Sequence, residues 1–307
     1  MAAGILDTIG GTPLAELRNV VRPNSARVLA KLEWANPTGS MKDRMARAAV
    51  EAAEADGRLQ RGGTAVEYTA GTTGVSLALV CAAKGYGLKI VFSDAFSEEK
   101  RRTMQAFGAE IEDVPSDRGA ITEALIKAMI ERSRQLSEQP GHWWVDQLNN
   151  ADATRGYEPM GEEIWRQTGG RVDAFVHAVS TAHSIHGAAR ALRRHGKDVH
   201  VAAVEPAESA VLSGGPTGSH KIEGIGIGFI PPLWEPDQVD EIIPVSTADA
   251  KAMTRRLARE EGFFAGTSSG ANVVAALQVA ERLGPGATVV TIMCDSGLRY
   301  LSTDVYR

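Results

Sequence analysis

The chain has 307 residues, a formal net charge of −5 and 43% hydrophobic residues. That length allows a large core and predicts about two domains. Arginines are dispersed among acidic residues, so no basic stripe suggests nucleic acid. The two cysteines lack metal-ligand spacing, and no apolar run is long enough to span a bilayer. We therefore expect a cytoplasmic protein without a metal site and without a nucleic acid or membrane partner.

Short β-rich runs alternate with longer helical runs along the chain. The first predicted helix follows Ser40, which has Asp43 three residues later as in a capping box, and it ends at Gly57. Strands are then predicted over 65–68, 88–93, 173–179, 199–205 and 287–293, and helices over 74–84, 97–107 and 184–195. Ser246, followed by Asp249, predicts another helix start. This alternation is typical of α/β proteins with parallel sheets.

The stretch from Gln139 to Gly161 is polar, contains aromatic residues and separates two α/β halves. It is the predicted crossing between domains. Ligands of open α/β sheets bind beyond the carboxyl ends of the strands. We therefore expect the functional residues to lie in the loops between strands and helices.

Lys42 falls in the first turn of the first predicted helix. A cation there faces the positive end of the helix dipole, which costs at least a few tenths of a kcal/mol and favours the uncharged amine. The position therefore suits a nucleophilic lysine. Taken alone, Lys42 could equally be a solvated surface residue.

Several loops have the residues needed to bind anions. "TAGTTG" (69–74) and "STAHS" (180–184) each follow a strand and open a helix, where free N–H groups and hydroxyls suit a carboxylate or a phosphate. "EGIGIGF" (223–229) allows close backbone approach but does not satisfy GxGxxG, which argues against a dinucleotide-binding dehydrogenase. Each loop alone could be an ordinary turn or cap.

Together, these segments resemble the cysteine synthase family of pyridoxal-phosphate enzymes. The resemblance rests on the order and spacing of "IGGTPL", "NPTGSMKDR", "TAGTTG", "QLNN", "STAHSIHG", "EGIGIGF", "GTSSGAN" and "DSGLRYLST", from about Ile9 to Thr303. It implies fold type II, the tryptophan synthase β-subunit-like fold, with two open twisted α/β domains and the cofactor in the cleft between them. It also implies a larger cofactor-binding domain of 1–38 and 149–307, a smaller mobile substrate-binding domain of 39–148, and a homodimer.

The resemblance also implies roles for individual residues. Lys42 matches the lysine that holds pyridoxal 5'-phosphate as a Schiff base, and Ser268 matches a neutral partner of the pyridine nitrogen. The other implied cofactor-binding residues are Thr72, Ser180, Thr181, Ala182, His183 and Ser184. The implied substrate-binding residues are Thr69, Ala70, Gly71, Thr73, Gln147 and Gly226.

The activity implied is β-replacement on an O-activated L-serine through an aminoacrylate intermediate. By default it joins O-acetylserine and sulfide to make L-cysteine. Three alternatives stay open. These are β-replacement with another donor or nucleophile, β-elimination as in serine or threonine dehydratases, and a non-catalytic scaffold that retains the fold.

Two loops depart from the family pattern. Where the family has TSGNTG, this sequence has "TAGTTG", so Ala70 and Thr72 replace a serine and an asparagine. Where the family has GTGGT, this sequence has "STAHS", so all three glycines are replaced and His183 is one of the replacements. We expect these changes to affect the substrate more than the fold, with weak use of O-acetylserine as one outcome and neutral drift as the other.

Overall fold

The computed structural model describes residues 4–119, 122–196 and 198–307. The chain forms two compact units: the smaller contains the residues up to Ile9 and Lys42–Gly156, and the larger contains Gly10–Met41 and Tyr157–Arg307. The step from Gly156 to Tyr157 lies inside the stretch 139–161. The smaller domain implied by the family resemblance, 39–148, begins and ends a few residues before Lys42–Gly156.

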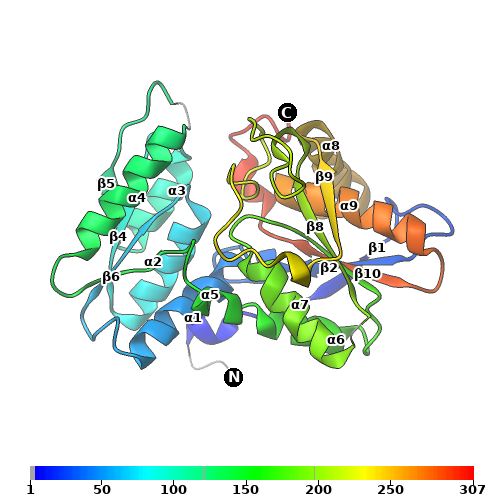
Figure 1. Ribbon diagram of the computed structural model, residues 1–307, viewed down its shortest axis with the longest axis horizontal. Coiled ribbons are helices and arrows are strands. Elements are labelled where there is room, and N and C mark those ends of the chain that lie inside the picture. Colours follow the sequence, from blue (N-terminus) through cyan, green and yellow to red (C-terminus); the bar gives the residue numbers. More distant parts are fainter. Residues whose placement is uncertain (1–3, 120–121, 197) are drawn as a thin grey trace. The chain divides into compact units, whose positions relative to one another are not determined.

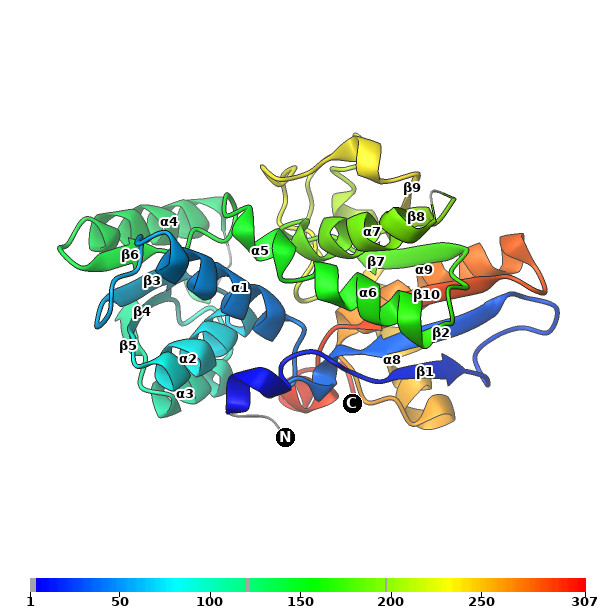
Figure 2. The same cartoon turned by 90° about the horizontal axis from the view of Figure 1, so that it is seen from below.

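The smaller unit is built on a four-stranded parallel sheet in the order β5-β4-β3-β6. Its strands are β3 (Thr64–Tyr68), β4 (Gly87–Phe92), β5 (Glu110–Asp113) and β6 (His142–Trp144). Its helices are α1 (Lys42–Ala55), α2 (Thr72–Lys84), α3 (Glu98–Ala106), α4 (Glu123–Ser137) and α5 (Asp152–Arg155). Helix α4 lies on one face of the sheet and α2 and α3 on the other (Figure 1 and Figure 2). Burial on both faces explains the mostly apolar sequences of the central strands β3 and β4.

The larger unit contains a six-stranded sheet in the order β1-β2-β10-β7-β8-β9. Its strands are β1 (Leu14–Leu17), β2 (Arg27–Leu32), β7 (Ala174–Ala178), β8 (His200–Pro206), β9 (Glu241–Val245) and β10 (Thr288–Met293). Only the β1–β2 pair is antiparallel among these. Helices α6 (Glu158–Gln167) and α7 (His183–His195) cover one face, and α8 (Thr247–Arg256) and α9 (Thr267–Leu283) cover the other (Figure 2).

Short 3-10 helices span Ile5–Thr8, Glu33–Ala35, Ala207–Ser209, Pro236–Gln238 and Gly297–Tyr300, and a π-helical turn spans Leu257–Glu261.

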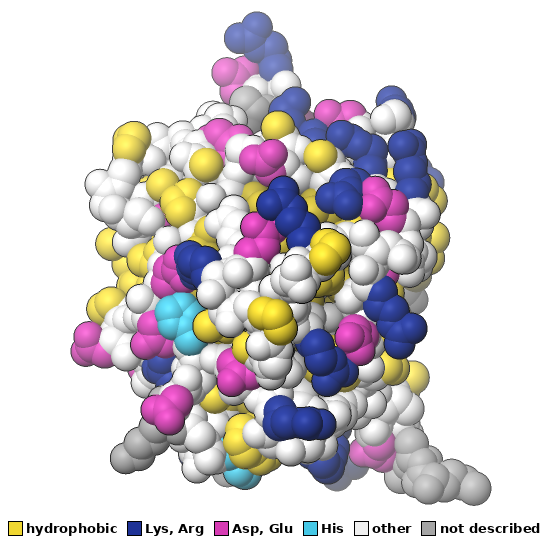
Figure 3. Space-filling model, turned by 90° about the vertical axis from the view of Figure 1, so that its right-hand side faces the viewer, with side chains coloured by type: hydrophobic (Ala, Val, Ile, Leu, Met, Phe, Trp, Pro, Cys, Tyr) yellow, Lys and Arg dark blue, Asp and Glu magenta, His cyan; other side chains and the backbone are white. Residues whose placement is uncertain are grey.

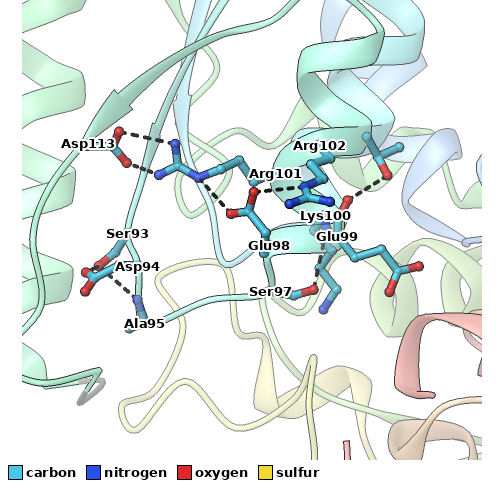
Figure 4. Close-up of polar contacts among 11 residues, drawn as sticks. Ser93, Asp94, Ala95, Ser97, Glu98, Glu99, Lys100, Arg101, Arg102 and Asp113 are labelled. Carbon is cyan, nitrogen blue, oxygen red and sulfur yellow. Dashed lines mark hydrogen bonds and ion pairs between the residues drawn. The ribbon is translucent and has the colours of Figure 1, made fainter. Parts of the chain in front are cut away.

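Serine side chains begin two of the helices as predicted. Ser97 Oγ accepts the Lys100 N–H at 3.5 Å, as Figure 4 shows, and Ser246 Oγ accepts the Asp249 N–H at 3.0 Å. Helix α1 begins at Lys42, two residues after Ser40, so Lys42 lies in the first helical turn as predicted. The carboxylate of Asp43 accepts a hydrogen bond from Ser76 Oγ at 2.6 Å and so joins α1 to α2.

Opposite charges are interspersed on the surface. On the face drawn in Figure 3, lysine and arginine side chains lie among aspartate and glutamate side chains. Exposed ion pairs such as Arg27–Glu16, at 3.0 Å, each add little to stability. Among the residues that the structure describes, no helix combines the length and the apolar character needed to cross a membrane.

Candidate functional site

Lys42 is the first residue of α1 and is half-buried. The chain just before it is held at the end of β10. The Met41 N–H donates to the Cys294 carbonyl at 2.9 Å, and the backbones of Ser40 and Asp295 form an antiparallel β-bridge. The chain just after it is held by the Asp43–Ser76 hydrogen bond. The backbone of Lys42 is therefore fixed on both sides, as a covalent attachment point requires.

The loop 69–74 joins β3 to α2 in the smaller unit. Thr69 Oγ1 accepts the N–H groups of Gly71 at 2.9 Å and Gly74 at 3.3 Å, which tightens the turn. Helix α2 begins at Thr72, earlier than predicted, so the N–H groups of Thr72 and Thr73 lie in its first turn. Such groups have no partner within a helix and suit a small carboxylate.

Gly71 is required in this loop by both its backbone and its surroundings. Its φ is 134°, a conformation that other residues rarely adopt. A Cβ atom there would collide with the side chain of Lys100, which extends from the first turn of α3 (Figure 4). The neighbouring side chains differ in exposure, since Ala70 is exposed and Thr72 is half-buried.

Gln147 is held by its own unit. Its Oε1 accepts the Thr73 hydroxyl at 2.9 Å, and its Nε2 donates to the Tyr68 carbonyl at 3.1 Å. Its backbone N–H donates to the carboxyl group of Glu67 at 3.1 Å. Glu67 is fully buried, and desolvation raises the pKa of its carboxyl group well above the ordinary value. Sequence reasoning missed Glu67, since it was only one polar residue in an apolar strand.

The loop 180–184 joins β7 to α7 in the larger unit. Ala182 has φ 69° and ψ −12°, in the left-handed region, and it directly precedes the first helical residue, His183. Thr181 Oγ1 lies 2.9 Å from His183 Nδ1, and the side chains of Thr181, His183 and Ser184 are buried. The backbone shape expected of a glycine thus persists at an alanine.

This second loop is chemically suited to a phosphate. It combines the N-terminal amides of the 13-residue helix α7 with the hydroxyls of Thr181 and Ser184. No acidic residue lies in the first turn of the helix. The donor set therefore fits the phosphate of the cofactor that the family resemblance implies.

Gly226 and Ser180 lie together in the larger unit. The Gly226 N–H donates to the Val179 carbonyl at 3.0 Å, and its φ is 62°. Ser180 and Gly226 line one pocket with Ser209 and Phe229. The structure therefore brings the glycine-rich loop against the start of the phosphate loop.

Ser268 is the second residue of α9 and is 4% exposed. The helix start is fixed around it, because Ser269 Oγ accepts the Cys294 N–H at 2.9 Å and Thr267 Oγ1 accepts the Glu223 N–H at 3.1 Å. A Cβ at Gly266, the residue before the helix, would collide with Asp295. Ser268 therefore has a defined position from which a neutral hydroxyl can serve a ligand.

The residues that the structure describes contain no group of histidine, cysteine or acidic side chains arranged to hold a metal ion. Burial raises the pKa of the Cys81 thiol to about 12. Cys294 is also buried, and neither cysteine forms a disulfide.

Comparison with known proteins gives consistent matches. Residues 5–295 match the family described as pyridoxal-phosphate dependent enzyme. A cysteine synthase of Staphylococcus aureus is 43% identical over 304 residues, which cover 98% of this chain and 96% of the relative. The solved structure of O-acetyl serine sulfhydrylase isoform 3 from Entamoeba histolytica is 40% identical, with a TM-score of 0.94 and coverage of 100% of this chain and 92% of that chain. A solved structure of O-ureido-L-serine synthase is 35% identical, with a TM-score of 0.93, and the match covers 100% of this chain and 95% of that chain.

Proposed function

Because the chain belongs to the pyridoxal-phosphate dependent enzymes, and among them to the cysteine synthases, we propose that it makes L-cysteine from O-acetylserine and sulfide by β-replacement. The observation that carries this proposal is the start of α7. There a left-handed Ala182 and the hydroxyls of Thr181 and Ser184 form a loop with the donors of a phosphate site. Lys42, at a fixed helix start, supplies the amine.

The family resemblance assigns the cofactor contacts to individual residues. Thr181, Ser184 and the amides of 180–184 would bind its phosphate, with His183 as a further donor. Ser268 would face its ring nitrogen, Thr72 its ring oxygen, and Lys42 would attach it. When bound, pyridoxal phosphate supplies an electron sink for the α-carbon of an amino acid. Because Ser268 is neutral, it does not favour protonation of the ring nitrogen, which suits elimination of a β-substituent over longer-lived carbanion chemistry.

The loop 69–74 would bind the substrate carboxylate. Thr69 Oγ1 accepts two N–H groups, so its own proton is directed elsewhere and can reach a carboxylate. Thr73 donates its hydroxyl proton to Gln147, so we assign Gln147 the task of orienting Thr73 and the helix start. Lys42 Nζ would then take the α-proton once the carboxylate fixes the amino acid.

The test is product analysis with the purified, cofactor-loaded protein. We expect L-cysteine from O-acetylserine and sulfide, and little pyruvate when sulfide is omitted. Pyruvate and ammonia formed at the same rate without sulfide would identify a β-eliminating enzyme instead. No turnover with any donor, despite bound cofactor, would support a non-catalytic protein that retains the fold.

A different donor is the second candidate, and the loop 69–74 favours it. Ala70 lacks the hydroxyl of the family serine and is exposed, and Thr72 is shorter than the family asparagine. These changes remove donors near a substrate while leaving the loop backbone intact. A panel of O-acetylserine, O-ureidoserine and O-phosphoserine, each with sulfide, separates the two candidates by the ratio of kcat/KM values.

We propose that the smaller unit, expected over 39–148, moves to enclose the substrate. Support comes from the grouping of Thr69, Thr72, Thr73 and Gln147 on that unit. Closure would exclude water from the reaction. Hydrogen exchange of the smaller unit should slow when O-acetylserine is added, and unchanged exchange in both units would contradict this motion.

We also propose that the protein is a cytoplasmic homodimer. The family resemblance supports the dimer, and two buried cysteines that form no disulfide suit a reducing compartment. Sedimentation should give twice the chain mass of 32.6 kDa. A monomer at micromolar concentration would contradict the dimer.

A further inference from the structure

His177 is a fully buried imidazole in β7 that belongs to none of the recognised motifs. Its side chain bridges two helices of the larger unit. Nε2 lies 2.8 Å from Ser184 Oγ on α7, and Nδ1 lies 3.2 Å from Asn272 Nδ2 on α9. Asn272 is fully buried and Ser184 is 7% exposed. The three side chains therefore form a continuous hydrogen-bonded path inside the protein.

The orientation of the Asn272 amide is determined by two backbone groups. Its Oδ1 accepts the Ala178 N–H at 2.7 Å, and its Nδ2 donates to the Ile292 carbonyl at 2.8 Å and lies 3.4 Å from Cys294 Sγ. If the amide were flipped, its nitrogen would face the Ala178 N–H and its oxygen would face the Ile292 carbonyl. Both contacts would be unfavourable, because all of these groups are buried. The amide nitrogen therefore faces His177, and Nδ1 of that imidazole must be an acceptor.

A neutral imidazole whose Nδ1 accepts carries its proton on Nε2. His177 therefore donates to Ser184 Oγ, and the single hydroxyl proton of Ser184 points away from the histidine. Among the residues that the structure describes, His177 is the side chain that bonds this hydroxyl. We propose that His177, oriented by Asn272, is a positioning residue that makes Ser184 a hydrogen-bond donor to the cofactor phosphate.

The inference rests on the proposed function, because it takes the phosphate of pyridoxal phosphate as the acceptor. A phosphate dianion only accepts hydrogen bonds, so a serine restricted to donating is matched to it. The hydrogen-bonded path through His177 also links the two helices, α7 and α9, that carry predicted cofactor contacts. Asn272 lies one helical turn after Ser268 on α9, and Ser184 lies in the first turn of α7.

The cofactor affinity of the apoprotein is the first readout, measured by quenching of protein fluorescence on titration with pyridoxal phosphate. His177→Phe keeps a ring of similar size and removes both nitrogens, and it should weaken binding about tenfold, as expected when one bond to a charged group is lost. His177→Gln is the matched control, because its amide can still donate to Ser184. It should stay within about threefold of the wild type.

A double-mutant cycle separates positioning from general damage. In a Ser184→Ala background, His177→Phe should cause no further loss of affinity, since the hydroxyl through which it acts is absent. An equal loss of affinity in both backgrounds would overturn the proposal and leave His177 with a purely structural role. Thermal unfolding of each variant verifies that the compared proteins are folded.

Nitrogen-15 NMR of the wild-type histidines tests the same claim without any variant. We expect His177 as the neutral Nε2–H form in both the apoprotein and the holoenzyme. An Nδ1–H form would overturn the proposal, even if His177→Phe failed to fold. A protein that binds no pyridoxal phosphate but shows the Nε2–H form would refute the proposed function alone. Normal cofactor binding together with an Nδ1–H form would refute this inference alone.

Discussion

The loops 69–74 and 180–184 have the same architecture and have changed in opposite ways. Both join a parallel strand to a helix, and both differ from the family pattern. In the first loop the glycine at the turn remains, with φ 134° at Gly71, while the side chains of Ala70 and Thr72 have changed. In the second loop the glycines are gone, yet Ala182 keeps a left-handed φ of 69°.

The surroundings of each loop explain the difference. Around Ala182, buried polar side chains supply new contacts, with Thr181 bonded to His183 and Ser184 bonded to His177. Around Gly71, the changed residue Ala70 is exposed and brings no new polar group. The second loop has therefore kept its hydroxyls at 181 and 184 and gained the side chains of Ser180 and His183, whereas the first has lost the serine hydroxyl at position 70. We accordingly expect changed substrate use to arise from the first loop.

The largest effect is expected at Gly71. Gly71→Ala combines a backbone conformation unfavourable to alanine with a collision against Lys100, and should lower the free energy of unfolding by about 2–5 kcal/mol. Denaturant unfolding measures this change, with Gly85→Ala as the control for a positive φ without a collision, because a Cβ there meets open space at a φ of 78°. Equal losses in the two variants would show that the Lys100 contact is unimportant.

A pH effect is expected next to the second loop, at His186. Burial lowers its pKa from 6.5 to about 4, and its Nε2 accepts the Glu235 N–H at 3.1 Å. Because the unfolded chain binds the proton more readily, stability should fall as pH decreases from about 6.5 towards 4, by up to about 3 kcal/mol. Above that range the imidazole of His186 is neutral in both the folded and the unfolded chain, so it no longer makes stability depend on pH.

The control is His186→Gln, whose side-chain oxygen can still accept the Glu235 N–H. Its free energy of unfolding should vary less with pH than that of the wild type across this window. Arg190 and Glu235, which also act on His186, remain in both proteins. Parallel pH profiles of the wild type and His186→Gln would exclude His186 as the cause.

Restoring the first loop should raise activity with O-acetylserine. Ala70→Ser together with Thr72→Asn returns a hydroxyl and an amide, and one recovered hydrogen bond to a charged group corresponds to about tenfold in kcat/KM. Ala70→Cys, of similar size but a weak donor, serves as the control. High native activity that the double change does not improve would mark the loop differences as neutral drift.

The smallest effect is expected at Ala182. Ala182→Gly relieves the left-handed strain but adds flexibility to the unfolded chain, so the net stabilisation should be about 1 kcal/mol or less. Cofactor affinity should hardly change, since the loop already has its binding shape. A large gain in affinity would show that the alanine distorts the loop, and that both loops have lost binding capacity.

Much of the fold was predictable because its signals are local. The end of α7 at His195, before Gly196, is confirmed, and its start lies one residue before the predicted position 184. The family assignment and the cofactor are also confirmed, because they rest on short segments whose order survives substitution. The predicted start of α2 lies too late in the sequence. Threonine is a poor helix former, yet Thr72 and Thr73 form the first turn of the helix.

The rest depends on contacts that are distant in sequence. His177 and Asn272 are 95 residues apart, and neither stands in a pattern that indicates their hydrogen bond. Glu67 contacts Gln147, which is 80 residues away. Strand β1, which pairs antiparallel with β2, breaks the parallel alternation that the sequence predicted. Such pairings come from the packed structure, so the local sequence carries no sign of them.

Reduction of the cofactor-loaded protein with borohydride, followed by digestion and mass spectrometry, tests the central claim most directly. We predict a yellow protein and one labelled peptide, the one that contains Lys42 at the start of α1. Lys42→Ala, folded and incubated with the cofactor, should show no label. A wild-type protein without label, or one labelled at another lysine such as Lys100, would contradict the account.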